Sequence, residues 1–369
     1  MSRLTVAVDH TAITANVAAL VARTSADVMA VVKADAYGHG LVAAAAAARA
    51  GGAAWLGVAQ PHEALDLRAA GDTGAILTWL YGADDIPAPD LLEADVDVSV
   101  ASLDVLKTVV EAALKTGRTA RVHIGVDTGL GREGCAMAVL PELLDAVAAR
   151  QREGTVEAVG MWSHLAWADQ PGHPTIDAQA ATFRAALDMA SAAGLDITLR
   201  HLANSACTLT RPDLHFDVVR PGIAVYGLPP VPDPQGANWG LRPAMRVTAN
   251  VVAIKHVDEG QGVSYGHTYV TDKPTTLALV SAGYADGVFR SASNAGPVTI
   301  RGQRYTIAGR VCMDQFVVDV GLDAAVDVGD EVVLVGPDGP SATEWADAAG
   351  TIDYEVVCRF GIGRMKGIA

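Results

Sequence analysis

A lysine stands at the end of an apolar run in the stretch AVVKADAYGHG, residues 30–40. The run predicts a buried strand, and burial at its end favours the neutral amine of Lys33, the form that attacks a carbonyl to give a Schiff base. Tyr37, Gly38 and Gly40 follow. The glycines permit a tight turn close to a bulky ligand, and the phenol can donate to an anion or pack. The alternative is a surface lysine whose stem lies along the protein.

Other polar residues also stand at the ends of predicted strands, where βα loops begin and where barrel enzymes keep their working residues. The set comprises Lys33, Asp127, His164, Asn204, Ser205 and Arg220. Any one of them could be a polar residue at the point where a strand meets solvent. Six such positions together favour a functional site.

Two later segments offer donors for one phosphate group. HLANSA supplies Asn204 and Ser205, and RPGIAVYG supplies the backbone N–H groups of Gly222 and Ile223. Late strand loops of such barrels often bind phosphate. The absence of a G-x-x-x-x-G-K-[ST] motif argues against a nucleoside triphosphate. A phosphate cradle together with a strand-end lysine predicts pyridoxal 5'-phosphate joined to Lys33.

Eight short apolar or β-branched runs, separated by Ala/Leu/Glu-rich helical stretches, would position these residues. The runs begin at Val28, Trp55, Ala75, Val96, Val122, Ala158, Leu199 and Val218. Eight βα units within residues 1–235 fit a closed (β/α)8 barrel of TIM type. A doubly wound sheet stays open at this point, because counting strands does not prove closure.

The pattern changes after LPPVPDPQGANWGLRP to alternating strands with turn signals. We therefore predict an α/β chain with a cofactor-binding barrel over residues 1–235 and a mostly β domain over residues 236–369. The opening run LTVAVDH, residues 4–10, has no helix before it. It is a candidate to pair with the C-terminal domain.

The totals exclude several classes of protein. Of 369 residues 50% are hydrophobic, and 27 Lys+Arg against 42 Asp+Glu give a net charge of −15. With no dense basic run, nucleic acid and anionic membranes are not expected as partners. The four cysteines lack any C-x-x-C spacing, so neither a metal site nor a disulfide framework is predicted. The N-terminus has no signal-peptide pattern, and we expect a cytoplasmic protein.

Seven motifs spread along both predicted domains resemble those of the bacterial alanine racemases, pyridoxal-phosphate enzymes of fold type III, in the same order. They are AVVKADAYGHG, VDTGLGREG, HLANSA, VRPGIAVYGL, GQGVSYGHTY, SAGYADGV and GRVCMDQ. The resemblance implies interconversion of L-alanine and D-alanine, supplying D-alanine for peptidoglycan. It also implies a homodimer in which the C-terminal domain of each subunit completes the active site of the other.

The resemblance also assigns roles. Lys33 would hold the cofactor and act as one catalytic base. Tyr265 from the other subunit would act as the second base on the opposite face of the substrate, because one base removes the α-proton and the other returns it. Arg220 would face the pyridine nitrogen, with His164 and His201 in its hydrogen-bond network. The phosphate would be held by Tyr37, Ser205, Tyr354 and the N–H groups of Gly222 and Ile223.

The same resemblance implies how the amino-acid substrate is held. Its carboxylate would meet Arg132 and the backbone N–H of Met313. Asp314 and Tyr284 would lie near the access path. The bulk of Tyr354 suits alanine, whereas relatives that act on serine tend to carry a smaller polar residue there.

The chain departs from the family at Gly125. The family commonly has a lysine at this position, often carbamylated, which braces the carboxylate-binding arginine. Glycine offers neither the charge nor the bond, so another acid, a bound anion or water must organise Arg132. The departure keeps open a racemase for another small amino acid such as serine. A non-racemising protein that binds pyridoxal phosphate would lack the second domain and Tyr265, and a decarboxylase of this barrel type would need a glycine-rich phosphate motif and a catalytic cysteine.

Overall fold

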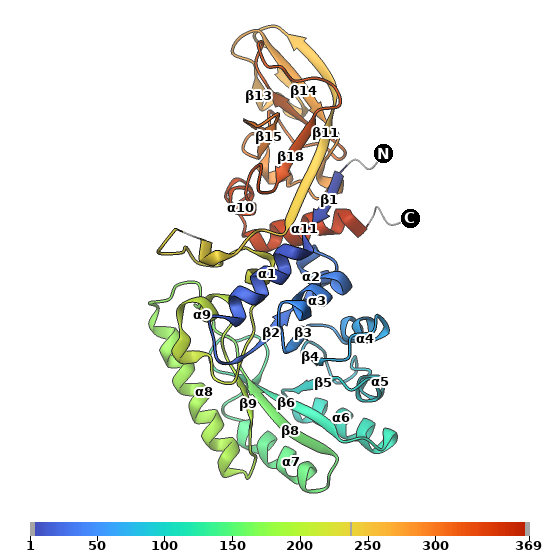
Figure 1. Cartoon of the computed structure of the whole chain (residues 1–369), viewed down its shortest axis with the longest axis vertical. Coiled ribbons are helices and arrows are strands. Elements are labelled where there is room, and N and C mark those ends of the chain that lie inside the picture. The colour runs from blue at the N-terminus through green and yellow to red at the C-terminus, as the bar shows by residue number, and fades with distance from the viewer. Residues whose placement is uncertain (1–3, 237, 366–369) are drawn as a thin grey trace. The chain divides into compact units, whose positions relative to one another are not determined.

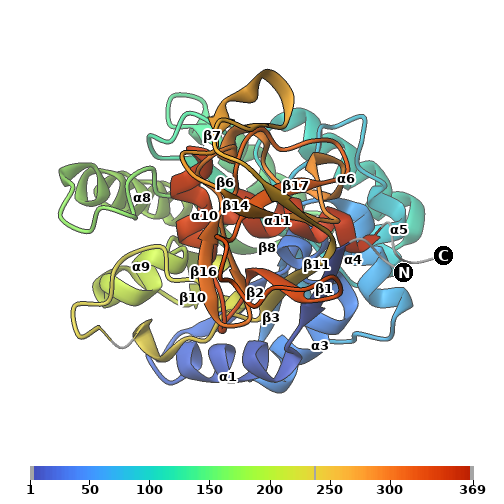
Figure 2. The same ribbon diagram turned by 90° about the horizontal axis from the view of Figure 1, so that it is seen from above.

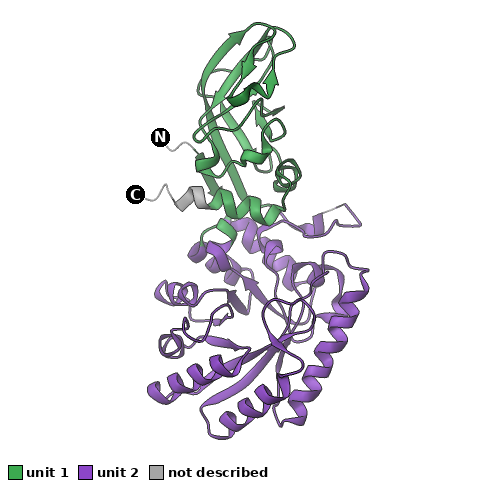
Figure 3. Cartoon of the chain, turned by 180° about the vertical axis from the view of Figure 1, so that it is seen from behind, with its two compact units in different colours: residues 1–9, 37–40, 243–369 green, residues 10–36, 41–242 purple. Residues whose placement is uncertain are grey.

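The computed structural model describes residues 4–236 and 238–365. The chain divides into two compact units (Figure 3). One comprises residues 10–36 and 41–242, and the other comprises residues 1–9, 37–40 and 243–369. The first strand and the short segment 37–40 therefore belong to the same unit as the C-terminal region.

The unit formed by residues 10–36 and 41–242 is built on a ring of eight parallel strands. They are β2 (Asp27–Val31), β3 (Trp55–Val58), β4 (Ala75–Thr78), β5 (Asp97–Val100), β6 (Ala120–Asp127), β8 (Val156–Trp162), β9 (Leu199–His201) and β10 (Val218–Val219). They pair in the order β10-β2-β3-β4-β5-β6-β8-β9, and the short strand β7 (Cys135–Ala136) pairs with β6. Each of the eight predicted runs contributes one strand to the ring.

Backbone contacts between the segments around β9 and β10 bring the ring close to closure. The N–H of Asp217 donates to the carbonyl of Arg200 over 3.0 Å, and the N–H of Arg220 donates to the carbonyl of Ala203 over 2.8 Å. Asn204 and Arg220 also form a parallel bridge. These contacts confirm the predicted barrel and exclude the doubly wound sheet, whose two edge strands do not pair with each other.

Apolar side chains fill one part of the ring. Met29, Trp55, Leu77 and Val218 come from four different strands and form one buried cluster. Strands β3 and β5 are buried along their whole length. Continuous burial is expected for parallel strands that are covered on both faces.

Helices lie around the outside of the strands, as Figure 2 shows for α1, α3, α4, α6 and α8. Besides α2 (Lys33–Gly38), the helices are α1 (His10–Val21), α3 (Leu41–Ala50), α4 (Pro61–Ala69), α5 (Ala88–Glu93), α6 (Leu103–Thr116), α7 (Leu140–Arg152), α8 (Pro174–Ala192) and α9 (Ser205–Thr210), with 3₁₀ turns η1 (Pro212–Leu214), η2 (Ile223–Tyr226) and η3 (Asn238–Gly240). Helix α6 has clear capping residues at both ends. The Ser102 side chain accepts the N–H of Val105, and Gly117 ends the helix in the left-handed conformation. Within residues 4–236 and 238–365, no helix has the length and apolar character needed to span a bilayer.

Strand β2 ends earlier than the apolar run predicts. It stops at Val31, and Lys33 opens the helical turn α2 (Lys33–Gly38). Four successive residues, 34–37, have φ between 52° and 55°. This is the left-handed region, which costs a non-glycine residue roughly 1–2 kcal/mol. The turn must therefore be held by contacts with the rest of the fold.

The unit that contains the C-terminal region is built on an antiparallel sheet, as predicted, with strand order β16-β15-β18-β11-β14-β17 and β1 paired to β11 (Figure 1). Its strands are β1 (Leu4–Val8), β11 (Met245–Val257), β14 (Thr275–Val280), β15 (Pro297–Ile300), β16 (Gln303–Thr306), β17 (Phe316–Asp319) and β18 (Glu331–Val335), beside a hairpin of β12 (Gly262–Val263) and β13 (Tyr269–Val270). Its helices are α10 (Ala342–Ala349) and α11 (Asp353–Met365), with 3₁₀ turns η4 (Tyr265–His267), η5 (Tyr284–Asp286) and η6 (Arg290–Ala292).

Within this unit, the segment 37–40 packs directly on the backbone of α11. A Cβ atom at Gly38 would lie 2.7 Å from the carbonyl oxygen of Val357. A Cβ atom at Gly361 would lie only 2.2 Å from the Cα of Gly38. The absence of both side chains permits the backbone-to-backbone contact.

We expect Gly361→Ala to lower the free energy of unfolding by about 1–3 kcal/mol, because backbone atoms cannot rotate away from the added methyl group. Urea unfolding followed by circular dichroism measures the change. Gly172→Ala is the control, because a Cβ atom there has no neighbour within 4 Å. Equal stability of the two variants would contradict the close contact.

Candidate active site

The six predicted strand-end residues all lie at or just beyond the carboxyl ends of barrel strands. Lys33 follows β2, Asp127 ends β6, His164 follows β8, the pair Asn204 and Ser205 follows β9, and Arg220 follows β10. Carboxyl ends of parallel strands meet at one end of a barrel. The structure thus brings these residues to a single face of this unit.

Asp127 has a structural role at this face. Its carboxylate accepts the N–H groups of Gly129, Leu130 and Gly131 over 2.9, 3.0 and 3.2 Å. These bonds shape the loop that carries Arg132. The alternative of a polar residue with a purely structural role therefore holds for Asp127.

A buried carboxylate that the sequence analysis missed supports the turn after Lys33. Glu63 is 5% exposed and accepts N–H groups from Ala34, Ala59 and Gln60 over 2.5, 3.0 and 2.9 Å. Asp35 adds a bond from the N–H of Leu41 over 2.7 Å. These bonds offset part of the cost of the left-handed backbone.

Arg220 is the buried cation of the site, with 6% of its surface exposed. Its guanidinium donates to the carbonyls of His201 and Ser163, each over 2.6 Å, and to Nδ1 of His201 over 3.1 Å. The guanidinium carbon lies 5.4 Å from the centre of the Trp162 ring. Burial lowers the pKa of Arg220 to about 10, so it stays charged at neutral pH.

A chain of buried hydrogen bonds leads from Arg220 through the barrel interior. Because a guanidinium can only donate, Nδ1 of His201 accepts, and Nε2 of His201 must carry the hydrogen. Nε2 of His201 lies 2.9 Å from Nδ1 of His123, and Nε2 of His123 lies 3.1 Å from a carboxylate oxygen of Asp97. Each imidazole thus donates onward, and Arg121 donates to both carboxylate oxygens of Asp97.

The sequence carried a signal for this chain of bonds. In β6, residues 121, 123, 125 and 127 alternate onto one face of the strand. Polar side chains in the middle of a barrel strand on its inward face require buried partners. The alternation predicts such a network, although it does not name Asp97 or His201 as its members.

His164 stays neutral over the physiological range of pH. Burial, followed by the positive charges of Arg220 and Arg132, lowers its pKa from 6.5 to about 3. The direct side-chain contact of Arg220 is with His201, and burial together with Arg220 also holds the pKa of His201 well below its ordinary value. The site therefore contains one buried cation beside two neutral imidazoles.

The predicted phosphate cradle is formed by neighbouring segments. The N–H of Gly222 donates to the Ser205 hydroxyl over 2.8 Å, and the N–H of Ala224 reaches the same oxygen over 3.4 Å. The side-chain oxygen of Asn204 accepts the N–H of Cys207 over 3.1 Å and caps α9. Ser205, Gly222 and Ile223 are therefore adjacent, while the oxygen of Asn204 is already used.

The other unit holds two sets of predicted residues. Tyr37 and Tyr354 lie together, with ring centres 6.2 Å apart, and burial, with the neighbouring Tyr354 and Cys358, raises the pKa of Tyr37. The second set surrounds Tyr265, which is 68% exposed.

Two turns hold the other members of the Tyr265 set. The N–H of Tyr284 donates to the carbonyl of Cys312 over 3.0 Å, and the N–H of Ala285 donates to Met313 over 2.9 Å. Met313 is 54% exposed, and Asp314 follows it in the chain. The Ser264 hydroxyl donates to the carbonyl of Arg310 over 2.6 Å, which links the Tyr265 turn to the same region. Large exposed apolar side chains gathered in this way are typical of a surface that another molecule covers.

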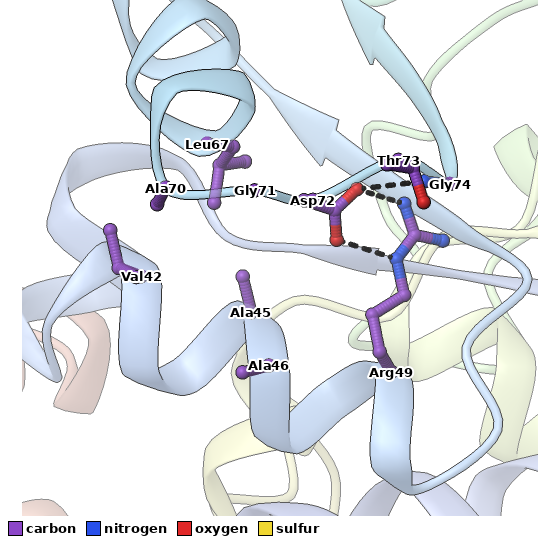
Figure 4. A pocket seen from close by; sticks show the side chains of 10 residues that line it. All are labelled: Val42, Ala45, Ala46, Arg49, Leu67, Ala70, Gly71, Asp72, Thr73 and Gly74. Atoms are coloured by element: carbon purple, nitrogen blue, oxygen red, sulfur yellow. Dashed lines mark hydrogen bonds and ion pairs between the residues drawn. The ribbon is translucent and has the colours of Figure 1, made fainter.

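A hollow lies between α3 and the segment that includes the end of α4 (Figure 4). It is lined by Val42, Ala45, Ala46, Arg49, Leu67, Ala70, Gly71, Asp72, Thr73 and Gly74. Arg49 makes a two-point pair with Asp72 and donates to the carbonyls of Ala54 and Ala75. Because this cation is already satisfied, the hollow offers no anion site.

Comparison with known proteins agrees with this arrangement. The family model described as "Alanine racemase, N-terminal domain" matches residues 8–230, and "Alanine racemase, C-terminal domain" matches residues 244–367. An alanine racemase of Salinispora tropica is 54% identical over 363 residues, covering 98% of this chain and 96% of the relative.

Solved structures give the same result. The crystal structure of alanine racemase from D-cycloserine producing Streptomyces lavendulae is 51% identical with a TM-score of 0.94, and 98% of this chain and 95% of that one are covered. The enzyme from Streptomyces coelicolor is 48% identical with a TM-score of 0.95, covering 98% of this chain and 97% of that one.

The histidine chain predicts a loss of stability in His123→Leu. The substitution removes the acceptor of the buried His201 N–H, and an unsatisfied buried donor costs about 1–3 kcal/mol. Urea unfolding measures the difference from the parent protein. His62→Leu, on the exposed start of α4, serves as the control, and a similar effect of both variants would contradict the network.

The neutral state of His164 predicts a simple titration experiment. Its ring NMR signals, assigned by comparison with His164→Gln, should show no protonation between pH 8 and pH 5, because the pKa is lowered to about 3. The unfolded chain takes up protons first as the pH falls below the ordinary value, so the free energy of unfolding should decrease from about pH 6 downwards. A midpoint above pH 5 for His164 would contradict its burial beside Arg220.

Proposed function

The chain belongs to the alanine racemase family and is an amino-acid racemase, and on this premise we propose that it interconverts L-alanine and D-alanine with pyridoxal 5'-phosphate. The observation that carries the proposal is the meeting of Lys33, Arg220 and Ser205 at one end of the barrel. An amine, a guanidinium and a hydroxyl backed by N–H groups match the aldehyde, ring nitrogen and phosphate of that cofactor.

The donor set of the chain fits the cofactor. Lys33 would hold it covalently, and Ser205, Gly222 and Ile223 would hold its phosphate together with Tyr37 and Tyr354. A phosphate dianion needs several donors, and the Ser205 hydroxyl and the Gly222 N–H lie 2.8 Å apart, within reach of one such group. When bound, the cofactor supplies an electron sink that acidifies the α-proton of the substrate.

Arg220 would control the ring nitrogen. It presents only donors and keeps its proton at neutral pH, because its pKa is about 10 even when buried. It would therefore hydrogen-bond the nitrogen without transferring a proton to it. By leaving the ring unprotonated, Arg220 would keep the electron sink weak and would favour racemisation over side reactions.

Two bases on opposite faces of the substrate would move the α-proton. Lys33 serves one face, and Tyr265 from a second copy of the chain serves the other. The 68% exposure of Tyr265 and the 54% exposure of Met313 support a dimer, since a catalytic phenol works in a site that excludes water. Asp314 and Tyr284 would line the access path of the same second copy.

Arg132 would bind the substrate carboxylate together with the N–H of Met313. We propose that Tyr354 narrows the site so that alanine is preferred over serine. D-alanine made by such an enzyme in the cytoplasm would supply peptidoglycan synthesis. Serine is the natural competing substrate, because only a hydroxyl group separates it from alanine.

The test combines product analysis with two variants of the purified protein. The parent should show a visible cofactor band and convert L-alanine to D-alanine faster than it converts serine. Lys33→Ala should lose both the band and the activity, whereas Tyr265→Phe should keep the band and lose about 10²–10⁴-fold in rate, the usual contribution of a general base.

Tyr305→Phe removes a hydroxyl from the hairpin strand β16 of the same unit and is the matched control for Tyr265→Phe. A parent protein that racemises serine but not alanine would replace the proposed substrate. A parent protein that binds no pyridoxal phosphate would overturn the proposal altogether.

A further inference from the structure

Arg132 needs a fixed position if, as the proposed function requires, it binds the substrate carboxylate. It is 58% exposed on the loop after β6, and a long exposed side chain loses rotational freedom when it binds. A negative group that holds the guanidinium beforehand removes part of that cost. The residue at position 125 cannot supply the group, because it is glycine.

The space beside Gly125 is already filled. A Cβ atom there would lie 3.2 Å from Nε1 and 3.3 Å from Cε2 of Trp162, and 3.4 Å from the Ser99 hydroxyl. Nε1 of Trp162 donates to that hydroxyl over 2.8 Å, which fixes the indole in place. The same indole lies against the guanidinium of Arg220. Even the first atom of a side chain at position 125 would therefore press on the tryptophan that Arg220 contacts.

Glu133 makes the contact that position 125 cannot make. Both of its carboxylate oxygens face Arg132: one pairs with Nε, and the other lies 2.6 Å from Nη2. The side chain of Glu133 is only 17% exposed, so the acid is the more buried partner of the pair. Burial opposes ionisation of Glu133, but the bond and charge of Arg132 outweigh it and hold the pKa of Glu133 below its ordinary value.

The two-point pair has a defined direction. The pair uses the Nε and Nη2 side of the Arg132 guanidinium. The bonds to Glu133 therefore leave the Nη1 edge of Arg132 unused, as far as the described part of the chain shows. A guanidinium can bind a second carboxylate through its remaining N–H groups. The Asp127 bonds that shape residues 129–131 fix the loop from which both side chains project.

We propose that Glu133 is a positioning residue that holds Arg132 ready for the substrate carboxylate and takes over the role of the missing side chain at position 125. Glu133 acts through Arg132 and does not touch the reacting atoms. Its loss should therefore weaken binding of carboxylates more than it slows the chemical step.

The experiment measures kcat and KM for alanine and the inhibition constant of propionate, a carboxylate without the amine, on cofactor-loaded protein. Glu133→Gln should raise KM and the propionate constant about 3- to 10-fold, the effect of leaving one long side chain unordered before binding, with kcat changed less than about 2-fold. Glu153→Gln removes the acid of an exposed pair with Arg150 and should change none of the three.

A double-mutant cycle shows whether the effect passes through Arg132. In the Arg132→Gln background, the further change Glu133→Gln should have no effect on either constant. Should Glu133→Gln not fold, Glu133→Asp keeps the carboxylate on a shorter side chain, weakens the same contact and should raise both constants by a smaller factor.

The outcomes separate this inference from the proposed function. A parent protein that racemises alanine, combined with unchanged constants in the Glu133 variant, overturns the role of Glu133 and leaves the racemase standing. An equal change in KM and in the propionate constant on Glu133→Gln, whether residue 132 is arginine or glutamine, also overturns the role of Glu133. A parent protein without activity on alanine rejects the proposed function itself.

Discussion

The buried guanidinium of Arg220 is the constraint on which the barrel and its site both depend. A desolvated cation costs several kcal/mol unless every donor finds an acceptor. Here the backbone N–H of Arg220 joins the segment beside β9, while the side chain uses the carbonyls of His201 and Ser163. The last strands must therefore converge at this point. Arg220 thus both joins the last strands of the ring and supplies the buried cation of the site.

The charge of Arg220 also sets the protonation of its surroundings. The interior holds a cation, two imidazoles and a carboxylate in series, from Arg220 through His201 and His123 to Asp97. Only one assignment of hydrogens satisfies all of these bonds, because arginine cannot accept. His164 stays neutral for the related reason that burial and nearby positive charge oppose a further cation. The proposed acid–base site therefore lies beside one fixed positive charge and two histidines that stay neutral.

Strained backbone lies beside both residues proposed as bases. Lys33 opens a turn whose next four residues are left-handed, and Tyr265 lies between Ser264, with φ of 60°, and His267, with φ of 45°. Such conformations persist only where the surrounding structure over-determines them. Around Lys33 the buried carboxylate of Glu63 supplies that restraint through three N–H groups. The backbone turn that begins at Lys33 is thereby held by contacts remote in sequence.

The sequence by itself determined the eight strand runs, the change to an antiparallel domain, and the strand-end residues including Lys33 and Arg220. These features follow from local periodicity and composition, which a single chain displays directly. The left-handed turn, the support from Glu63, and the link from His123 to Asp97 were decided only in three dimensions. The close approach of Trp162, from another strand, to Gly125 was also decided only in three dimensions. Such contacts depend on side chains from distant segments meeting within a few ångströms, and no local pattern encodes that distance.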